Sequence, residues 1–318
     1  MRQVSAIIPN WNGAGHLARA LESLAAQTHA INEVLVIDNG STDNSIAIAE
    51  QGGARVIALG ANRGFAYAVN RGIETATGDW LAILNNDVEL DAAWLATLMA
   101  TNAWFATGKL LSMDGRIDGS YDALCRGACS WRCGAGRPDG AAWNQSSEIH
   151  FAPFTAAVFR AELFQQVGLL DEDYESYLED VDFGLRCALA GLSGMYVPNA
   201  RAIHQGSATL GRWHGRTVRQ IARNQLLLVA KHYPPGWFLH YGWPVLIAQL
   251  LWGFAALRHG AVLPYLQGKL EGLRSFRGMR RPGPSEISTI LEQSEREILE
   301  LQKQTGFDPY WKLYFALT

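Results

Sequence analysis

The chain has 318 residues, which is long enough for one large domain with an additional segment. Its composition is that of a globular protein, with 48% hydrophobic and 18% charged residues, and its formal net charge is −3. This mild acidity argues against a nucleic-acid-binding protein, which would need a basic surface to bind phosphates. We therefore expect no nucleic-acid partner.

The first hundred residues alternate short apolar runs with segments of helical spacing. Between the apolar runs, hydrophobic residues recur at intervals of three and four, as in Leu17, Leu21 and Leu24. The runs, rich in Val, Ile and Leu, are residues 4–9, 33–38, 54–59 and 80–84. This alternation predicts βαβ units and hence an α/β fold with a mostly parallel sheet flanked by helices. No signal peptide precedes the first run, so we expect this part to be cytoplasmic.

Further along, the pattern becomes irregular and then resumes. Residues 104–151 are rich in Gly, Asp, Ser and Arg, and we expect extended loops over a cleft there. Three short strands are expected afterwards, at 155–159, 194–197 and 200–204. From Gly211 onward the sequence indicates helices, with a break at Pro234-Pro235.

Polar clusters follow each of the first four apolar runs. They are Pro9-Asn10-Trp11-Asn12-Gly13, Asp38-Asn39-Gly40-Ser41-Thr42-Asp43, Asn62-Arg63-Gly64-Phe65 and Asn85-Asn86-Asp87. The carboxyl ends of parallel strands meet at one edge of a sheet, where open α/β proteins bind ligands. Any single cluster could be an ordinary turn or helix cap. Four of them on one edge indicate a ligand-binding site.

These clusters offer groups that suit a nucleotide. Trp11 has a face on which a nucleobase can stack. Asp38 and Asn39 can bind a base imide N–H and ribose hydroxyls, and Arg63 can neutralise phosphate oxygens. The hard oxygen atoms of Asn85–Asp87 suit Mg²⁺ or Mn²⁺ shared with a diphosphate.

Two acidic residues, Glu179 and Asp180, stand where a helix is expected to begin. Because a helix N-terminus stabilises a carboxylate, we expect Asp180 to be ionised at pH 7 and able to accept a proton. The alternative is that both acids only interact favourably with the helix dipole. His204 ends an expected strand, where it is either a structural residue or a metal ligand.

Three of the four cysteines, Cys125, Cys129 and Cys133, recur at every fourth position of a glycine-rich segment. This spacing invites a metal-site interpretation. No fourth Cys or His completes a zinc-binding set at the usual spacing, so we favour ordinary thiols in a reduced protein.

The motifs together resemble those of family 2 glycosyltransferases, which have the GT-A fold. The likeness is strongest to the rhamnosyltransferase-like enzymes that build bacterial surface polysaccharides, and it covers about residues 4–275. It implies that Asp87 and His204 hold a divalent cation, and that Asp180, with Glu179 beside it, is the catalytic base. It also implies a nucleotide-sugar site formed by Pro9, Trp11, Asp38, Asn39, Asn62, Arg63, Asn85 and Asn86. Asn85 stands where many family members carry Asp, so the donor diphosphate would supply more of the coordination.

The resemblance implies transfer of a sugar from a nucleoside diphosphate donor, a dTDP- or UDP-sugar, with inversion at the anomeric carbon. By analogy with the rhamnosyltransferase-like enzymes, the sugar would be L-rhamnose. The acceptor would be a hydroxyl of a glycan or of a lipid-linked molecule. The catalytic domain would span 1–215, with a nucleotide-sugar half at 1–100 and an acceptor half at 101–215, followed by a helical region at 216–318. Two alternatives remain open: a nucleotidyltransferase of the sugar-nucleotide type, and a catalytically degenerate sugar-nucleotide-binding subunit.

The segment 237–257 is largely apolar, but His240, Pro244 and Gln249 interrupt it and make a membrane-spanning helix unattractive. A basic run follows it, formed by Arg258, Lys269, Arg274, Arg277, Arg280 and Arg281. Apolar surface beside basic residues predicts a peripheral helix on anionic lipid, at the inner face of the cell membrane. The alternative is that the segment packs on the catalytic domain or in a homodimer.

Overall fold

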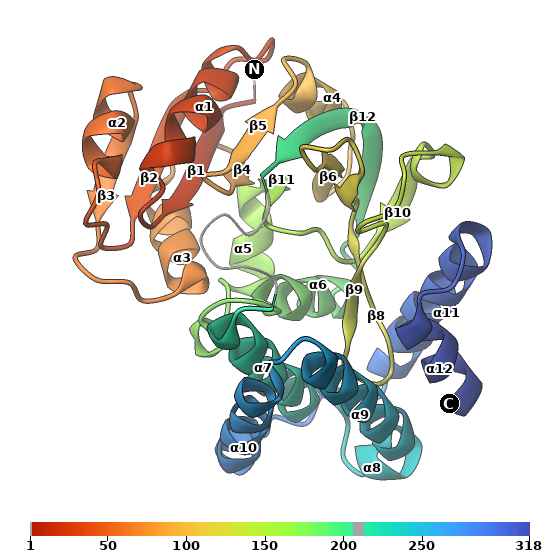
Figure 1. Ribbon diagram of the computed structural model, residues 1–318. Helices are drawn as coiled ribbons and strands as arrows, with labels where there is room; N and C mark the ends of the chain where they lie inside the picture. Colours follow the sequence, from red (N-terminus) through yellow and green to blue (C-terminus); the bar gives the residue numbers. More distant parts are fainter. Residues whose placement is uncertain (1, 206–212) are drawn as a thin grey trace. The chain divides into compact units, whose positions relative to one another are not determined.

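The computed structural model describes residues 2–205 and 213–318 (Figure 1). Residues 206–212 therefore lie outside the described residues, including Gly206 and Ser207, which follow the candidate ligand His204 closely, and Arg212. The chain forms two compact units. The first consists of Met1–Asp122 with Arg132–Thr209, and the second of Ala123–Trp131 with Leu210–Thr318. The short segment Ala123–Trp131 therefore belongs with the carboxyl-terminal helices, which the sequence division at residue 215 did not foresee.

A ten-stranded sheet forms the core of the first unit. Its parallel part contains the four strands expected from the apolar runs: β1 (Val4–Asn10), β2 (Glu33–Asp38), β3 (Arg55–Ala58) and β4 (Trp80–Leu84). All of β1 and β4 is buried, as expected for strands covered on both faces. The register pairs Asn10 with Asp38, so the polar ends of β1 and β2 lie side by side.

The rest of the sheet is mixed. β11 (Ala156–Arg160) runs antiparallel between β4 and β6 (Phe105–Leu111), and β12 (Gly194–His204) runs parallel to β6. Three shorter strands complete it: β5 (Val88–Leu90) and β10 (Ser147–Ile149), which both pair with β12, and β7 (Ile117–Gly119), which pairs with β6. A separate two-stranded ladder joins β8 (Asp122–Leu124) and β9 (Ser130–Arg132).

Two sequence expectations are wrong in this region. Residues 104–151 are not all loops, because they contain the central strand β6. Its sequence was missed because it carries Gly108 and Lys109; the fully buried Lys109 ammonium pairs with Asp139 at 2.7 Å. The two strands expected at 194–197 and 200–204 are one strand, β12, whose pairing with β6 is irregular between Val197 and Arg201.

Helices cover both faces of the sheet. α1 (Ala14–Ala25) buries the predicted stripe that includes Leu17, Leu21 and Leu24, and packs with α4 (Trp94–Met99) on the face that carries Ala6 and Ile8. α3 (Phe65–Thr75) lies on the opposite face, where its Gly72 approaches Ile7 and Ile37. The other elements of this unit are α2 (Ser45–Gln51), α5 (Ala161–Val167), α6 (Glu179–Leu189) and two 3₁₀ turns, Ala141–Trp143 and Glu172–Tyr174.

The second unit is helical. Its helices are α7 (Gly215–His232), α8 (Trp237–His240), α9 (Gly242–Arg258), α10 (Val262–Met279), α11 (Ile287–Thr305) and α12 (Pro309–Leu317). The segment Ala123–Trp131 is held among them: Leu124 N donates to Ser294 Oγ at 2.7 Å, and Arg126 pairs with Glu295 at 2.7 Å. Among the described residues, no helix combines the length and hydrophobicity needed to cross a bilayer.

The close approach of β12 to β6 gives a test of the fold. A Cβ atom added to Gly108 would collide with the backbone carbonyl of Ala200, so Gly108→Ala should lower the free energy of unfolding by about 1–3 kcal/mol. Urea denaturation would measure it. Gly15→Ala is the control, because nothing lies near that position and alanine suits a helix better by up to about 1 kcal/mol. Equal stability of the Gly108 variant and wild type would contradict this packing.

Candidate functional site

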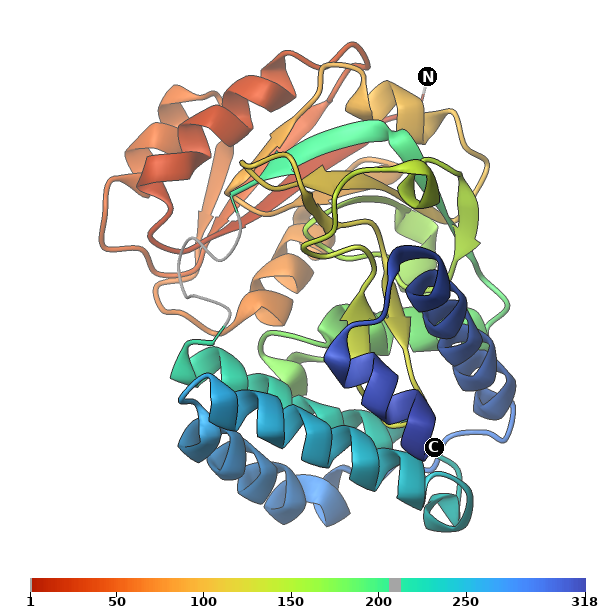
Figure 2. The same ribbon diagram turned by 45° about the vertical axis from the view of Figure 1, so that its right-hand side comes forward.

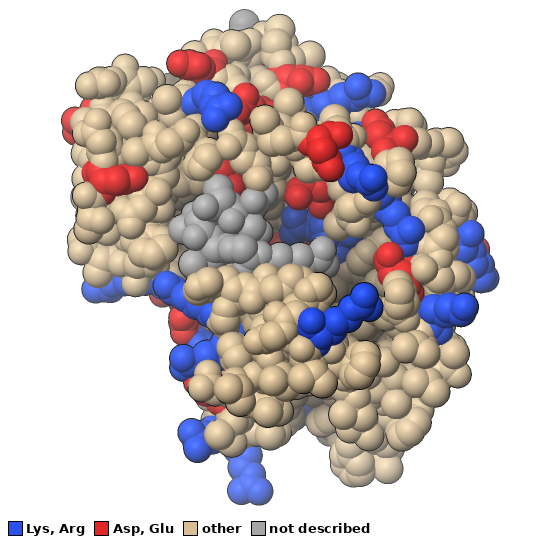
Figure 3. All heavy atoms as spheres, in the orientation of Figure 1, with Lys and Arg blue, Asp and Glu red and all other residues tan. Residues whose placement is uncertain are grey.

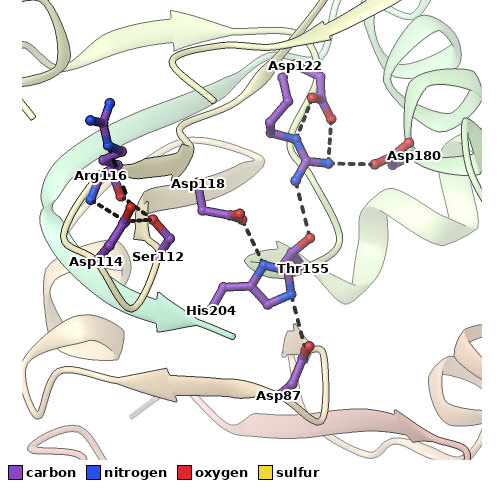
Figure 4. A network of polar contacts seen from close by, with 10 residues as sticks. Asp87, Ser112, Asp114, Arg116, Asp118, Asp122, Thr155, Asp180 and His204 are labelled. Carbon is purple, nitrogen blue, oxygen red and sulfur yellow. Dashed lines mark hydrogen bonds and ion pairs between the residues drawn. The ribbon is translucent and has the colours of Figure 1, made fainter. Parts of the chain in front are cut away.

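Asp87 and His204 meet because β5 pairs with β12. The antiparallel register sets His204 opposite Val88, the residue after Asp87, and Gln205 N donates to the Asp87 carbonyl at 3.1 Å. As a result, Asp87 Oδ1 lies 3.2 Å from His204 Nε2 (Figure 4). Both residues are largely buried.

A third residue, Asp118 of β7, binds the other side of the His204 ring. Its Oδ2 lies 2.7 Å from His204 Nδ1 (Figure 4). Burial lowers the pKa of His204, but hydrogen bonds to Asp118 and Asp87 and the charges of both outweigh burial and raise the pKa to about 9. Sequence reasoning missed Asp118 because it lies in a segment interpreted as loops, and no local motif marks it.

The pair formed by Asp87 and His204 fits a divalent cation. Two neighbouring ligands of an octahedral Mg²⁺ lie about 3 Å apart, since each bond is about 2.1 Å, and the observed N–O separation is 3.2 Å. His204 Nε2 is buried beside Asp87 Oδ1, while Asp118 can accept from Nδ1–H and leave Nε2 as the ligand atom. Among the described residues no group of three or more His, Cys, Asp or Glu side chains is arranged as a metal site. Further ligands would have to come from the substrate or water.

The segment before α6 has an unusual backbone. Glu175, Tyr177 and Leu178 have φ values of 59°, 71° and 70°, a region that residues other than glycine seldom adopt. This segment contacts the start of α3: Phe65 N donates to Ser176 Oγ at 3.1 Å, and Ala66 N donates to Glu175 O at 3.0 Å. The loop before Asp180 is therefore held by the loop that follows β3.

A short series of contacts connects Asp180 to the turn after β4. Asp180 Oδ2 lies 3.7 Å from Arg132 Nη2, and the Arg132 guanidinium binds both oxygens of Asp122, at 2.6 and 3.1 Å. Arg132 Nη1 also donates to Thr155 Oγ1 at 3.4 Å, and Thr155 O accepts from Asn85 N at 2.9 Å. Figure 4 shows Asp122, Thr155 and Asp180 in the same region as the pair formed by Asp87 and His204.

The expectation that Asp180 is ionised at pH 7 is met only in part. It does lie in the first turn of α6, but burial and the charge of Asp122 raise its pKa, Arg132 lowers it, and the result is about 7. Burial and the charge of Asp180 raise the pKa of Glu179 well above its usual value, which favours its protonated form. Of the two acids, Asp180 is the one that can exchange a proton near neutrality.

The polar ends of β1, β2 and β4 are joined by side-chain hydrogen bonds. Asn86 Nδ2 donates to Asn10 Oδ1 at 2.7 Å, and Asn10 Nδ2 donates to Ser41 Oγ at 3.2 Å and to Asp38 Oδ1 at 3.4 Å. A side chain at Gly13 would collide with the bridge between Asn10 and Asn86. These strand ends therefore meet at one edge, as the parallel sheet predicts.

The remaining predicted nucleotide-binding residues differ in their contacts. Asn39 Nδ2 donates to Asn62 Oδ1 at 3.3 Å and to Gly64 O at 3.0 Å, and Asn39 Oδ1 accepts from Arg63 N at 2.9 Å. Asn39 and Asn62 therefore shape the loop after β3. The Arg63 guanidinium lies over the Tyr67 ring, 5.0 Å from its centroid.

The other three predicted residues, Pro9, Trp11 and Asn85, also lie at this edge. Pro9 is buried in β1 beside Ile37 of β2, and Trp11 and Asn85 are half-buried in the turns that follow β1 and β4. A ligand bound at this edge of the sheet could therefore reach Trp11 and Asn85.

Comparisons with known proteins identify the family. The model of glycosyl transferase family 2 matches residues 5–124, and that of glycosyl transferase family group 2 matches residues 140–268. The N-acetylglucosaminyl-diphospho-decaprenol L-rhamnosyltransferase of Mycobacterium tuberculosis (strain ATCC 25618 / H37Rv) is 30% identical over 258 residues, which cover 72% of this chain and 84% of the relative. The chain belongs to glycosyltransferase family 2. Membership decides against the nucleotidyltransferase alternative.

Solved structures show that this family 2 glycosyltransferase has the GT-A fold. GalNAc-T7, solved with UDP, GalNAc and Mn²⁺, superposes with a TM-score of 0.63 at 16% identity, over 97% of this chain and 59% of the other. The mannosyltransferase PcManGT from Pyrobaculum calidifontis, in complex with GDP-Man and Mn²⁺, gives a TM-score of 0.54 at 16% identity, over 99% of this chain and 86% of the other.

The contact between Asp118 and His204 makes a measurable prediction. Asp118→Asn removes a charged acceptor from the ring, so the pKa of His204 should fall below about 9. NMR titration of the His204 ring in metal-free protein would measure it, with the resonance assigned by its loss in His204→Gln. Asp114→Asn is the matched control, since this exposed aspartate contacts Ser112 and Arg116 instead. An unchanged His204 pKa in the Asp118 variant would contradict the assigned role.

Proposed function

We propose that this glycosyltransferase moves a sugar from a nucleoside diphosphate donor to an acceptor hydroxyl, with inversion at the anomeric carbon. The observation that carries the proposal is that two groups of polar contacts, one at His204 and one at Asp180 (Figure 4), are connected through Thr155 and the turn after β4. Asp87 and His204 are spaced as two ligands of a cation, and Asp180, with a pKa of about 7, is linked to the same turn through Arg132. A binding protein without catalysis would need no such base, which argues against the degenerate-subunit alternative.

The donor site is formed by the polar strand ends. In this proposal Trp11 stacks on the base of a dTDP- or UDP-sugar, and Asp38 binds the base or ribose. Asn39 and Asn62 act by shaping the loop that carries Arg63. Pro9, Asn85 and Asn86 complete the wall of the site.

A divalent cation, Mg²⁺ or Mn²⁺, would be held by Asp87 and His204, with Asp118 orienting the imidazole ring. When bound, such an ion stabilises the negative charge that develops on the departing diphosphate. The Mn²⁺ in the GalNAc-T7 and PcManGT complexes supports this choice. Without the ion, the positively charged imidazolium of His204 pairs with the two aspartates.

Asp180 would take the proton from the acceptor hydroxyl as the new glycosidic bond forms. Its pKa of about 7 suits this role, because a base works best when its pKa is near the working pH. Burial and the charge of Asp180 raise the pKa of the neighbouring Glu179, which disfavours a second negative charge beside the base. The positive charge of Arg132 keeps the pKa of Asp180 from rising further.

The acceptor is proposed from the relatives. The name of the mycobacterial relative specifies an L-rhamnosyl donor group and a diphospho-decaprenol acceptor. By analogy, this enzyme would transfer L-rhamnose to a glycan or lipid-linked acceptor in bacterial surface polysaccharide synthesis. It would work in the cytoplasm at the inner face of the cell membrane, with residues 1–100 binding the donor and 101–215 the acceptor.

Replacing the base tests the mechanism. Asp180→Asn should lower kcat by at least about 10²–10⁴-fold while the dissociation constant for the donor changes only a few-fold. In wild type, kcat should fall as pH drops through about 7, because Asp180 becomes protonated there. Asp173→Asn, an exposed residue ahead of α6, is the control and should keep full activity. Near-wild-type turnover of the Asp180 variant would show that another group is the base.

Removing the cation tests the proposed metal site. Chelation with EDTA should abolish transfer, and Mn²⁺ should restore it in wild type but not in Asp87→Ala. Titration calorimetry of Mn²⁺ into protein with nucleoside diphosphate should show binding that this variant loses. Full activity in chelator would rule out the proposed metal role.

A further inference from the structure

The second unit exposes a stripe of large apolar side chains along α9. At intervals of three and four residues, these side chains are 48–68% exposed: Trp243, Leu246, Leu250, Phe254 and Leu257. This spacing places them on one side of the helix. α9 therefore has an apolar outer side in addition to the side that it buries within its own unit.

α10 carries a second stripe of the same kind. Its members are 49–69% exposed: Leu263, Leu266, Leu270 and Leu273. The two helices pack directly on each other, since Tyr265 OH donates to Gln249 O at 2.6 Å and the Tyr265 ring lies against Gly253.

The two stripes lie next to this contact. Leu250 and Phe254 follow the contacting residues Gln249 and Gly253 in sequence, and Leu266 follows Tyr265, so both stripes border the line where the helices touch. Figure 2 shows α9 and α10 side by side. Phe238 and Leu239 of α8, 63% and 75% exposed, extend the same apolar character at the beginning of α9. We call these exposed residues of α8, α9 and α10 the apolar face.

Basic residues border the apolar face. Arg258 ends α9, Arg274 and Arg277 lie near the end of α10, and all three are exposed. Residues 242–279 contain one acid, Glu271, and this is paired with Arg219 of α7 at 2.9 Å. In Figure 3 the surface over α8 and much of α9 shows almost no charged side chains, and Lys or Arg side chains project at the end of α10.

We propose that the apolar face lies on an anionic lipid bilayer, with its leucines and aromatic rings in the interface and its arginines among the headgroups. Exposed apolar side chains beside basic ones are the pattern of helices that lie in a bilayer surface. So many large apolar side chains exposed on neighbouring helices typically mark a site of interaction with a partner or a membrane. The proposal rests on the proposed function in one respect: a lipid-linked acceptor would be presented at this surface.

A second copy of the chain fits the apolar face less well. A two-fold interface brings the same surface of each copy together, so arginines at the border would meet arginines. α9 and α10 offer no free carboxylate to pair with them, because Glu271 is already bound to Arg219. Anionic headgroups would supply the missing negative charge.

Co-sedimentation of the full chain with lipid vesicles tests the proposal. Wild type should bind phosphatidylcholine vesicles that contain phosphatidylglycerol. It should bind vesicles of pure phosphatidylcholine at least tenfold more weakly. Leu250→Gln with Phe254→Gln should weaken binding at least tenfold by removing apolar contact, and Arg274→Gln with Arg277→Gln should do so by removing charge. Met113→Gln is the control, since Met113 is 66% exposed but lies in the first unit. Circular dichroism would verify that each variant is folded.

Two further readouts separate the possible failures. Analytical ultracentrifugation should show that the Leu250 and Phe254 variant has the same oligomeric state as wild type. Failure of wild type to bind anionic vesicles, or a dimer that this variant dissociates, would overturn the proposal. Hydrolysis of the nucleotide-sugar donor without acceptor should be equal in wild type and the variants. Vesicle binding without any donor hydrolysis would contradict the proposed function but would still support the proposed membrane-binding role of the apolar face.

Discussion

The pairing of β5 with β12 is the constraint on which the site depends. Asp87 lies in the turn between β4 and β5, but His204 reaches it only because β6, β11 and β12 build the other half of the sheet. The register that sets His204 opposite Val88 then fixes the 3.2 Å approach to Asp87, and β7 brings Asp118 to the other ring nitrogen. The proposed cation ligands therefore come from one turn, which carries Asp87, and from one strand end, which carries His204.

The pKa of Asp180 depends on a balance of burial and charge. A helix N-terminus favours a carboxylate, whereas burial and the nearby Asp122 favour the protonated form, and the Arg132 guanidinium moderates the result. The same guanidinium binds Thr155, which accepts a hydrogen bond from Asn85. Arg132 therefore lowers the pKa of Asp180 and also links it to the turn that carries Asp87.

The sequence predicted what depends on neighbouring residues and missed what depends on distant ones. The strands β1–β4 and the buried stripe of α1 follow from local periodicity, and strand order explains why Asn10 and Asp38 meet. β6 was missed because its glycine and its buried lysine are acceptable only through Ala200 and Asp139, which lie far along the chain. Asp118 and Arg132 have no local signature, and the pKa of Asp180 was misjudged because burial cannot be read from the first turn of a helix.

The most direct test of the account is a crystal structure of the enzyme with a nucleoside diphosphate sugar and Mn²⁺, using anomalous scattering to locate the metal. We expect one ion within about 2.0–2.3 Å of both Asp87 Oδ1 and His204 Nε2, touching the diphosphate, with the Asp180 carboxylate facing the anomeric carbon. An ion bound away from these two residues, or an Asp180 side chain directed away from the sugar, would contradict it.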